Sequence, residues 1–406
     1  MTAWARSMGH VVVVGASLAG LRAAEVLRGE GFRGAITMVG DEPHGPYDRP
    51  PLSKQVLTGE WPPERTALPA ASAATLQVTW ERGVAATGLD MGARHVTLDD
   101  GRSLDFDGLV VATGARARTL PGTEHLAGAY ALRTIDDAVA MRLALDAGVE
   151  RVVVVGAGFI GAEVAASCRA RGVEVTLVEP LAGPLARVLG PEISQVIADL
   201  HAEHGVDLRM GVGVDAVEGT TRVEGVRLTT GDTLRTDLVV VGIGVIPNTD
   251  WLSGSGLTVD DGVVCDETTL AAPGVVAAGD VARWPNARYA GELMRVEHWE
   301  HALNMGAHAA RRLLAGEGGG DPFGTVPWFW SDQYDRKIQL AGRPRADDQI
   351  AVVAGSLAER RFCVLYGRAG KVTAVLAMNM AGRVVRYRRA LAEGEGLAWE
   401  AALAAG

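Results

Sequence analysis

Three glycines in the run VGAGFIGAE have the spacing of a phosphate-binding turn. Gly156, Gly158 and Gly161 form the pattern G-x-G-x-x-G directly after a row of valines. In such a loop the first glycine permits a tight turn, the second lets a pyrophosphate approach the backbone, and the third lets a helix pack closely on the strand. The positive end of that helix faces the phosphate. The spacing therefore predicts a dinucleotide-binding loop.

An acidic residue ends the next apolar run, VEVTLVEP, about 20 residues beyond the loop. At that place Glu179 can accept hydrogen bonds from both hydroxyls of an adenine ribose, and its charge would repel a 2′-phosphate. This arrangement favours NADH over NADPH as the bound nucleotide.

A second loop of this kind lies near the N-terminus in VVVVGASLAG, where Gly15 and Gly20 are present and Ser17 replaces the middle glycine. A small side chain leaves room for a pyrophosphate, and the Ser17 hydroxyl would then contact it directly or through a water. Asp41 and Glu42 close the following apolar run. Either acid can bind a ribose, and the sequence does not decide between them.

Both loops lie in copies of one unit, residues 10–43 and 151–180. Each copy reads as an apolar strand, a glycine turn, an Ala-rich helix that ends near glycine, and a second apolar strand that ends in an acid. This order predicts a β-α-β unit within a parallel sheet. An alternating, strand-like region follows each copy, over 95–115 and 226–248, so the similarity of the two halves extends beyond the glycines.

The last part of the chain has a different pattern. A helical pattern over 300–316 leads into GEGGGD at 316–321, which is typical of a linker. From Pro322 onward strand-like runs dominate, namely PWFWSDQ, KIQLAG, RFCVLYG and KVTAVLAMN. The predicted fold class is therefore α/β, with two Rossmann-like dinucleotide-binding domains and a C-terminal α+β domain.

Composition excludes several classes of protein. A chain of 406 residues is expected to form two or three domains. Its formal net charge of -10 argues against a general attraction to nucleic acid or to anionic membranes. The three cysteines, Cys168, Cys265 and Cys363, stand far apart without ligand spacing, so neither a redox disulfide nor a metal site is indicated. The first residues carry no signal-peptide or membrane-spanning run, and we expect a cytoplasmic protein.

Two dinucleotide loops in one chain are explained most simply by a flavin and a nicotinamide nucleotide. With these loops the chain resembles the glutathione-reductase-type flavoproteins. Within them it is similar to the NADH-dependent, FAD-containing ferredoxin reductases of the putidaredoxin reductase and rhodocoxin reductase type, which include reductase components of ring-hydroxylating dioxygenases. The motifs that carry the resemblance follow the family's order along nearly the whole chain: VGDEPHGPYDRPPLSK (39–54), LVVATGARAR (109–118), LRTIDDA (132–138), VGAGFIGAE (155–163), VGIGVIPNT (241–249), VAAGDVA (276–282), RVEHW (295–299) and PWFWSDQY (327–334). PPLSK combined with FWSDQ is far more specific than either glycine loop.

The resemblance implies an NADH:ferredoxin oxidoreductase. Hydride would pass from NADH to FAD, and single electrons would then pass to a small iron-sulfur ferredoxin, of the 2Fe-2S type or similar. That ferredoxin would serve a cytochrome P450 or a ring-hydroxylating oxygenase. FAD would be held by residues 1–117 and 244–321 and NAD by residues 118–243, while residues 322–406 would fold over the flavin.

Catalytic positions also follow from the resemblance. Lys54 would approach the flavin N5 edge, and Glu163 would lie near the nicotinamide, where it can pair with Lys54. Asp280 would bind the ribityl chain, and Arg133 would reach the FAD pyrophosphate or the flavin. Two of these residues fit structural roles as well, because Glu163 can complement a helix dipole and Asp280 can be a turn residue.

A helix that begins at 297–299 would direct its positive end at the flavin N1 and O2 region and stabilise the reduced ring. Trp299 and Trp330 would lie beside the isoalloxazine, although either can equally be a core tryptophan. The full set of cofactor-binding residues implied by the resemblance is Gly15, Ser17, Ala19, Gly20, Asp41, Glu42, Arg49, Lys54, Ala86, Ala112, Thr113, Gly114, Arg133, Gly156, Gly158, Phe159, Ile160, Gly161, Glu163, Glu179, Gly242, Ile243, Gly244, Asp280, Val281, Glu297, His298, Trp299 and Trp330.

A basic surface is also expected, because ferredoxins of this family are generally acidic and this chain carries a net negative charge. A run of basic residues is equally typical of a solvated face. The candidates are Arg311, Arg312, Arg336, Lys337, Arg383, Arg386, Arg388 and Arg389.

The main alternative is an NADH oxidase or another NADH-dependent flavin reductase on the same fold. In this superfamily, disulfide and peroxide chemistry uses a cysteine beside the flavin, in the segment after the first β-α-β unit. Here that segment is DRPPLSKQVL and contains no cysteine, so a disulfide reductase or a peroxidase is disfavoured. The negative charge disfavours a DNA-associating flavoprotein of the apoptosis-inducing-factor kind. A non-catalytic nucleotide-binding module is a further alternative.

Overall fold

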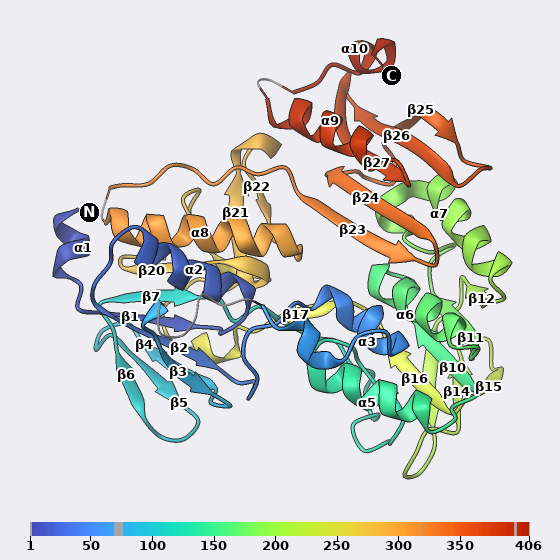
Figure 1. The fold of residues 1–406 in the computed structure, drawn as a ribbon, viewed down its shortest axis with the longest axis horizontal. Helices are drawn as coiled ribbons and strands as arrows, with labels where there is room; N and C mark the ends of the chain where they lie inside the picture. The colour runs from blue at the N-terminus through green and yellow to red at the C-terminus, as the bar shows by residue number, and fades with distance from the viewer. Residues whose placement is uncertain (1, 69–75, 317, 394–395, 406) are drawn as a thin grey trace. The chain divides into compact units, whose positions relative to one another are not determined.

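The computed structural model describes residues 2–68, 76–316, 318–393 and 396–405 (Figure 1). The chain forms two compact units, each assembled from separate stretches. The predicted division at residues 117, 243 and 321 stays a prediction, and the predicted linker includes residue 317, which lies outside the described residues. Unit 1 consists of Met1–Asp48, Thr66–Arg116 and Ile246–Pro327, and unit 2 of Arg49–Arg65, Ala117–Val245 and Trp328–Gly406.

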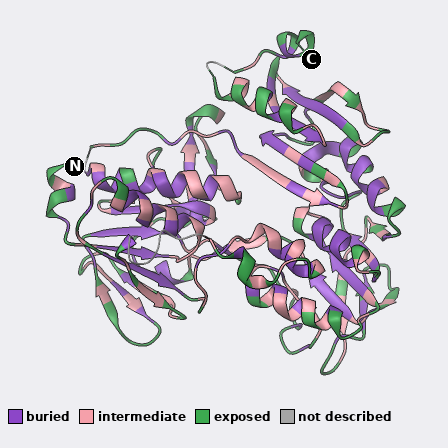
Figure 2. Cartoon of the chain, in the orientation of Figure 1, coloured by how far each residue is buried: buried purple, intermediate pink, exposed green. Residues whose placement is uncertain are grey.

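A six-stranded sheet with the order β19-β20-β7-β1-β2-β3 forms the centre of unit 1. β1 (His10–Val14) pairs in parallel with β2 (Ala35–Gly40) and β7 (Gly108–Val111). The valines of β1 are almost completely buried, as expected of a strand covered on both faces (Figure 2). α2 (Leu18–Gly29) and α8 (Trp299–Ala315) pack on this sheet and on each other.

Smaller elements complete unit 1. The alternating region after the first β-α-β unit forms strands, as predicted, and β4, β5 and β6 make a separate three-stranded sheet. The elements not yet given are α1 (Ala3–Ser7), β3 (Thr79–Arg82), β4 (Ala86–Asp90), β5 (His95–Leu98), β6 (Ser103–Asp105), η3 (Asp250–Leu252), β18 (Val263–Val264), β19 (Leu270–Ala272), β20 (Val275–Ala277), η4 (Gly279–Val281), β21 (Ala282–Asn286), η5 (Ala287–Tyr289) and β22 (Glu292–Met294). β8 (Ala115–Ala117), β17 (Val245–Pro247) and η2 (Pro63–Thr66) lie where the chain passes from one unit to the other.

Unit 2 repeats the same arrangement in a five-stranded sheet with the order β12-β11-β10-β16-β9. β10 (Arg151–Val155) pairs in parallel with β11 (Glu174–Glu179) and β16 (Leu238–Val241). α6 (Phe159–Ala170) connects β10 to β11. The second β-α-β unit therefore has the predicted order of elements.

An antiparallel sheet with the order β23-β24-β27-β26-β25 makes up the last part of unit 2. It shares a hydrophobic core with α7 (Ala186–Glu203), in which Leu189 and Ile193 pack with Phe362 and Leu376. The basic run RVVRYRRA lies on α9 (Ala381–Ala392). The two mainly parallel sheets and this third sheet confirm the predicted α/β fold class with a C-terminal α+β domain.

The remaining elements of unit 2 include further strands of these sheets, the three-stranded sheet β13-β14-β15 and several helices. None of the helices within the described ranges is long and apolar enough to cross a membrane. The elements are η1 (Pro50–Ser53), α3 (Gln55–Thr58), β9 (Ala129–Tyr130), α5 (Ile135–Asp146), β12 (Asp207–Met210), β13 (Val214–Glu218), β14 (Gly225–Leu228), β15 (Thr233–Arg235), β23 (Trp328–Gln333), β24 (Arg336–Gly342), β25 (Gln349–Ser356), β26 (Arg361–Arg368), β27 (Lys371–Met378) and α10 (Trp399–Ala404).

Candidate functional site

The first glycine loop, in unit 1, joins β1 to α2 through two positions that only glycine fits. Gly15 has a φ of +117°, and a Cβ there would lie 2.0 Å from the carbonyl oxygen of Ala112. A Cβ on Gly20 would lie 1.9 Å from the carbonyl oxygen of Gly15. Ala19 packs so closely on α8 that a Cβ on Gly306 would lie 2.3 Å from its carbonyl oxygen. These contacts hold the start of α2 at the carboxyl edge of the sheet, where dinucleotides bind in this fold.

Ser17 occupies the N-cap position of α2, with φ −101° and ψ −160°. Gly158 occupies the N-cap position of α6, with φ −72° and ψ −178°. Both conformations are extended, so the backbone does not require glycine at this position. The Ser17 hydroxyl bonds none of the described residues, which leaves it and the first N–H groups of α2 available to a phosphate. The predicted contact with a pyrophosphate therefore stays a prediction.

The second glycine loop, in unit 2, has the same two steric constraints. Gly156 has a φ of +97°, and a Cβ there would lie 2.4 Å from the carbonyl oxygen of Gly242. A Cβ on Gly161 would lie 2.0 Å from the carbonyl oxygen of Gly156. By contrast, a Cβ on Gly158 would have no heavy atom nearer than the Gly242 oxygen at 4.0 Å. The space beside the middle glycine is open, as a pyrophosphate cradle requires.

Glu179 lies at the end of β11, next to the second loop. Its Oε2 accepts from the backbone N–H of Ala157 at 2.8 Å, and its Oε1 accepts from that of Leu181 at 3.0 Å. Each carboxylate oxygen can accept a second hydrogen bond. The carboxylate is therefore held in place and still able to accept from ribose hydroxyls.

The two acids of the first unit are placed differently. Strand pairing sets Val39 opposite Val14 and Val178 opposite Val155, so Gly40 takes the position that Glu179 has in unit 2. The acids of unit 1 therefore stand beyond the last residue of the strand.

Asp41 and Glu42 follow the end of β2, and their carboxylates differ in what they contact. The Glu42 carboxylate accepts a hydrogen bond from the Tyr47 hydroxyl. The exposed Asp41 carboxylate bonds none of the residues that the structure describes.

The carboxyl end of β7 contributes further predicted residues in unit 1. Thr113 and Asn248 are joined by two hydrogen bonds, from Thr113 Oγ1 to the Asn248 carbonyl at 2.7 Å and from Asn248 Nδ2 to the Thr113 carbonyl at 2.9 Å. Gly114 has a φ of +64°, and Ala112 is buried against the first loop. Ala86 is the first residue of β4.

The carboxyl end of β16 is the counterpart in unit 2, with residues 242–244 beside the second loop. Ile243 and Ile160 expose 38% and 48% of their surfaces, which is unusual for isoleucine. Phe159 packs edge-on against Phe329, with ring centroids 4.3 Å apart. Two exposed aliphatic side chains flank the cradle and provide apolar surface for a bound nucleotide.

α8 begins at Trp299 with His298 as its N-cap, as the sequence predicted. Trp299 Nε1 donates to Asp48 Oδ1 at 2.7 Å, so its indole N–H is satisfied within unit 1. Glu297 forms an ion pair with Arg295 at 2.7 Å. The His298 cap makes no side-chain bond to the helix, so the first N–H groups of α8 are not capped by it.

Asp280 and Val281 lie in η4 of unit 1, and Val281 is completely buried. The Asp280 charge acts on the buried His301, whose ring stacks on Trp284 at 4.8 Å. Burial nevertheless lowers the pKa of His301 to about 3, so this histidine is neutral at physiological pH.

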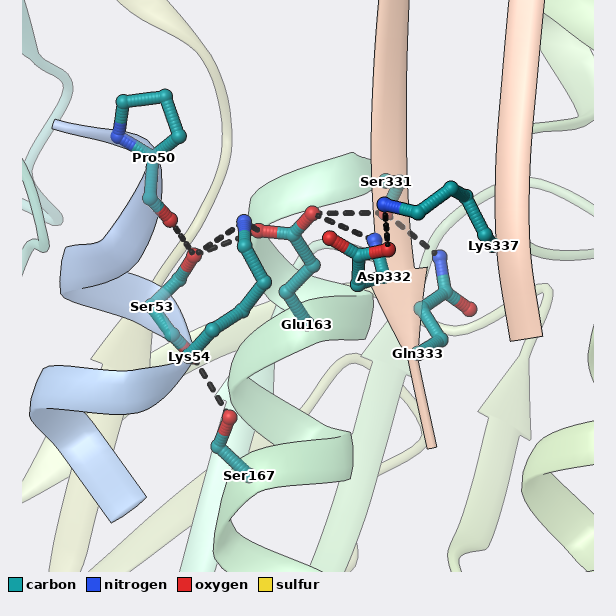
Figure 3. Close-up of polar contacts among 9 residues, drawn as sticks. All are labelled: Pro50, Ser53, Lys54, Glu163, Ser167, Ser331, Asp332, Gln333 and Lys337. Atoms are coloured by element: carbon teal, nitrogen blue, oxygen red, sulfur yellow. Dashed lines mark hydrogen bonds and ion pairs between the residues drawn. The ribbon is translucent and has the colours of Figure 1, made fainter. Parts of the chain in front are cut away.

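Lys54 and Glu163 come together in unit 2, as Figure 3 shows. Lys54 Nζ lies 2.7 Å from Glu163 Oε2, and only 3% of the Glu163 side chain is exposed. Glu163 lies in the first turns of α6, and Lys54 lies between η1 and α3. A buried carboxylate needs a countercharge and further donors to be stable.

Those further donors were not predicted from the sequence. Ser53 Oγ donates to Glu163 Oε2 at 2.5 Å, and Ser331 Oγ donates to Oε1 at 2.8 Å. The backbone N–H of Asp332 donates to Oε1 at 3.3 Å. Ser53 and Ser331 stand in the motifs PPLSK and FWSDQ, so these motifs carried the signal, but the prediction named their neighbours Lys54 and Trp330.

Three other predicted residues lie elsewhere in unit 2. Arg49 Nη1 donates to the Arg133 carbonyl at 2.7 Å. The backbone N–H of Arg133 donates to Asp137, whose carboxylate also accepts from the Thr134 N–H in the capping box at the start of α5. Trp330 packs beside Trp328 with ring centroids 5.3 Å apart.

The prediction that Arg312 belongs to a basic surface is wrong. Arg312 is buried at 5% exposure and donates to Thr268 and to the Gly316 carbonyl. Its position near the end of α8 allows the guanidinium to satisfy a carbonyl at the helix terminus.

Several other basic candidates are neutralised by acidic neighbours. On α9 Arg386 is exposed, and Arg388 lies over the Trp328 ring. The ion pairs are Arg311 with Glu30, Arg336 with Asp335, Lys337 with Asp332 and Arg389 with Glu393.

Two Rossmann-like sheets with glycine cradles at their carboxyl edges define an α/β oxidoreductase that uses two dinucleotides. Comparison with known proteins leads to the same class. The model of the pyridine nucleotide-disulphide oxidoreductase family matches residues 9–306, and that of a reductase C-terminal domain matches residues 328–405. The chain therefore belongs to the pyridine nucleotide-disulphide oxidoreductase family, and it is an FAD- and NAD(P)H-dependent oxidoreductase.

Relatives of similar length cover almost the whole chain. Rhodocoxin reductase of Rhodococcus erythropolis is 38% identical over 387 residues, which cover 94% of this chain and 89% of that protein. Putidaredoxin reductase CamA of Pseudomonas putida is 38% identical over 379 residues, which cover 91% of this chain and 88% of that protein.

Solved structures show the same similarity. The chain matches the covalent putidaredoxin reductase-putidaredoxin complex with a TM-score of 0.89 at 36% identity, covering 94% of this chain and 93% of that one. It matches the ferredoxin reductase for the CYP199A2 system from Rhodopseudomonas palustris with a TM-score of 0.91 at 36% identity, covering 97% and 96%. These comparisons confirm the family predicted from the sequence.

Proposed function

We propose that this chain is an NADH:ferredoxin oxidoreductase that passes electrons from NADH through FAD to a small iron-sulfur ferredoxin. The observation that carries the proposal is the pair of uncapped glycine cradles, one in each unit, together with the buried Lys54–Glu163 pair. When bound, the nicotinamide and the flavin supply the hydride chemistry themselves. The protein has to bind them, orient them and exclude water.

FAD binding is assigned to unit 1. The start of α2 with Ser17 would hold the pyrophosphate, and Asp280 would bind the ribityl chain. Either Asp41 or Glu42 would bind the ribose, since a carboxylate that accepts from Tyr47 can still accept further hydrogen bonds. The start of α8 would stabilise negative charge on the reduced flavin through its partial positive charge.

NADH binding is assigned to unit 2. The start of α6 with Gly158 would hold the pyrophosphate, and Glu179 would accept from the adenine ribose and repel the 2′-phosphate of NADPH. The exposed Ile160 and Ile243 would cover apolar parts of the nucleotide.

Lys54 and Glu163 are the proposed catalytic residues. Glu163 accepts hydrogen bonds from four donors, which fix its carboxyl group beside Lys54 Nζ. A fixed ammonium of this kind can orient the nicotinamide. It also attracts electron-rich atoms of the bound cofactors. Hydride transfer itself requires no acid or base, so their role is orientation and charge.

A ferredoxin is the proposed electron acceptor, since relatives include the reductases named after rhodocoxin and putidaredoxin. The ferredoxin in turn would serve a cytochrome P450 or a ring-hydroxylating oxygenase, as the names of the CYP199A2-system reductase and the anthranilate 1,2-dioxygenase component indicate for those relatives. The exposed Arg386 on α9 provides positive charge for an acidic partner.

Two further parts of the proposal concern organisation and location. We retain the division into an FAD part at 1–117 and 244–321, an NAD part at 118–243 and a third domain at 322–406. We also propose a cytoplasmic location, which the free, buried state of Cys168, Cys265 and Cys363 supports because reducing compartments keep thiols unpaired.

The test is NADH-dependent reduction of cytochrome c with and without candidate 2Fe-2S ferredoxins. We expect activity that depends on a ferredoxin and falls steeply with added salt. Activity that never depends on a ferredoxin, with NADH consumed and oxygen reduced, would instead identify an NADH oxidase.

A further inference from the structure

A line of buried polar side chains continues from Glu163 into the C-terminal sheet and on to α7, all within unit 2. Ser331 Oγ, which donates to Glu163, lies 3.2 Å from Gln333 Nε2. Gln333 Oε1 lies 3.1 Å from His201 Nε2, and His201 Nδ1 lies 2.9 Å from the Tyr334 hydroxyl. Figure 3 shows the first part of this line, from Glu163 to Gln333.

Each member of the line is placed by its own element. Ser331 and Gln333 are two residues apart on β23, so they point to the same face of the strand. His201 lies in the last turns of α7. Ser331, Gln333 and His201 each have 0% exposure, so water cannot replace any of their hydrogen bonds.

The direction of every hydrogen bond follows from the charge of Glu163. A carboxylate cannot donate, so the Ser331 hydroxyl must donate to it and can only accept from Gln333. Gln333 must therefore present its NH2 group to Ser331 and its oxygen to His201.

The same reasoning fixes the histidine. Because Gln333 Oε1 can only accept, His201 carries its proton on Nε2 and leaves Nδ1 bare to accept from the Tyr334 hydroxyl. From Tyr334 to Glu163, all donors point the same way.

The surroundings of His201 agree with a neutral ring. Burial lowers the pKa of His201 to about 4 and outweighs the hydrogen bond with Gln333, which acts in the opposite direction. His204 stacks on the Tyr334 ring with centroids 3.6 Å apart, which holds the phenol in place at the outer end of the line.

We propose that Ser331, Gln333 and His201 are positioning residues that act through Glu163 to fix the direction of the Lys54 ammonium. This inference rests on the proposed function, in which Lys54 orients the bound nicotinamide.

The geometry explains why Glu163 needs this support. Its Oε2 is shared by Ser53 and Lys54, while its Oε1 is held by Ser331 at 2.8 Å and by the Asp332 N–H at 3.3 Å. Without the Ser331 hydroxyl, only the longer bond would hold Oε1, and the carboxylate could rotate. Lys54 would keep its countercharge but lose a fixed direction.

The first test determines which ring nitrogen of His201 carries the proton, and it requires no enzyme activity. In the 15N spectrum of the histidine rings, assigned by the signal lost in His201→Gln, His201 should be the neutral Nε2–H form from pH 6 to 8. A His201 signal of the Nδ1–H form would overturn the inferred direction of the hydrogen bonds.

The second test compares Ser331→Ala with Ser194→Ala by stopped-flow reduction of the FAD-loaded protein at a series of NADH concentrations. Ser194 is also a buried serine of unit 2, and its hydroxyl donates to the Pro184 carbonyl at 2.7 Å, away from the line. Ser331→Ala should lower the limiting rate about tenfold, with less than a threefold change in the Kd for NADH, whereas Ser194→Ala should leave the limiting rate within about twofold. Gln333→Met, which keeps the volume but removes the amide, should lower the limiting rate about threefold.

The outcomes separate the two claims. If the wild-type flavin is not reduced by NADH at all, the proposed function fails. The 15N spectrum of His201 then still tests the inferred direction of the hydrogen bonds. If the wild type is reduced and Ser331→Ala behaves like Ser194→Ala, the positioning role is wrong while the proposed function stands.

Discussion

The two glycine loops build the same turn, yet they differ at the middle position and two residues beyond the last glycine. Gly158 in unit 2 corresponds to Ser17 in unit 1, and both adopt an extended N-cap conformation. The buried Glu163 corresponds to Arg22, whose half-exposed side chain pairs with Glu25 on the surface of α2.

This comparison separates the reasons for having glycine. The outer glycines of each loop are required by sterics, because an added Cβ would collide with a backbone oxygen. The middle position, Ser17 or Gly158, is free of that constraint, so its side chain can differ according to the ligand that each loop binds. The difference between Glu163 and Arg22 shows that one repeated element carries a buried charge in one unit and solvated charge in the other.

The largest expected effect tests the steric part of the comparison. Gly156→Ala should lower the free energy of unfolding by about 3 kcal/mol, because it combines a positive φ with a collision against the Gly242 oxygen. Gly158→Ala, in the same loop, should change it by less than about 0.5 kcal/mol. Urea unfolding followed by circular dichroism measures both, and equal losses would show that the middle glycine is also structural.

The second prediction tests the buried carboxylate of Glu163, whose counterpart in unit 1 is the half-exposed Arg22. Glu163→Gln should slow flavin reduction by NADH about 100-fold without loss of FAD, because a misdirected Lys54 no longer orients the nicotinamide. Arg22→Gln, at the matching position of unit 1, should leave the rate within about twofold. Stopped-flow absorbance measures the rate, and unchanged kinetics in Glu163→Gln would refute the catalytic role of the pair.

The third prediction concerns pH and the buried histidines, of which His201 lies in unit 2 and His301 in unit 1. Their pKa values are lowered by burial to about 4 and about 3, below the ordinary value of 6.5. Between each lowered pKa and 6.5 the unfolded chain binds more protons than the folded one. The free energy of unfolding therefore rises with pH in this window, and stability is lost as the pH falls below 6.5.

Each such histidine should contribute up to about 1.4 kcal/mol per pH unit in this window. His201→Gln should show a shallower loss of unfolding free energy between pH 6.5 and 4 than the wild type. A wild-type stability that is flat over this range would contradict the lowered pKa values.

The smallest expected effects come from exchanging the middle residues of the two loops. Ser17→Gly should speed FAD release about threefold, since it removes one hydroxyl beside the proposed phosphate position. Gly158→Ser should raise the Kd for NADH about threefold and leave FAD release unchanged. Both should keep the wild-type unfolding free energy, and a large loss of stability in either variant would mean that the loops are not equivalent.

The sequence was sufficient for the local parts of this fold. The positions of Gly15, Gly20, Gly156 and Gly161 follow from a spacing that only one turn satisfies, and the strand and helix on either side follow from their apolar periods. β25 was not predicted because its residues are mostly half-exposed and lack a clear alternation.

The site was only partly predictable, because its contacts join distant parts of the chain. Lys54 and Glu163 were predicted from the family resemblance, but Ser331 and His201 meet Glu163 and Gln333 only after the C-terminal sheet packs on α7. Side chains alternate between the two faces of β23, so Ser331 points to the face opposite Trp330. Trp330, and not Ser331, was the residue expected to lie beside the flavin. Arg312 was misplaced because a basic pattern does not show which side chain turns inward to satisfy a helix end.

The most direct test of the central claim is an anaerobic titration of the FAD-loaded protein with NADH, followed by the flavin absorbance. Two cradles that serve FAD and NADH predict complete bleaching by about one equivalent of NADH, with NADPH much slower because of Glu179. A flavin that stays yellow with excess NADH would contradict the account and leave a nucleotide-binding protein without reductase activity.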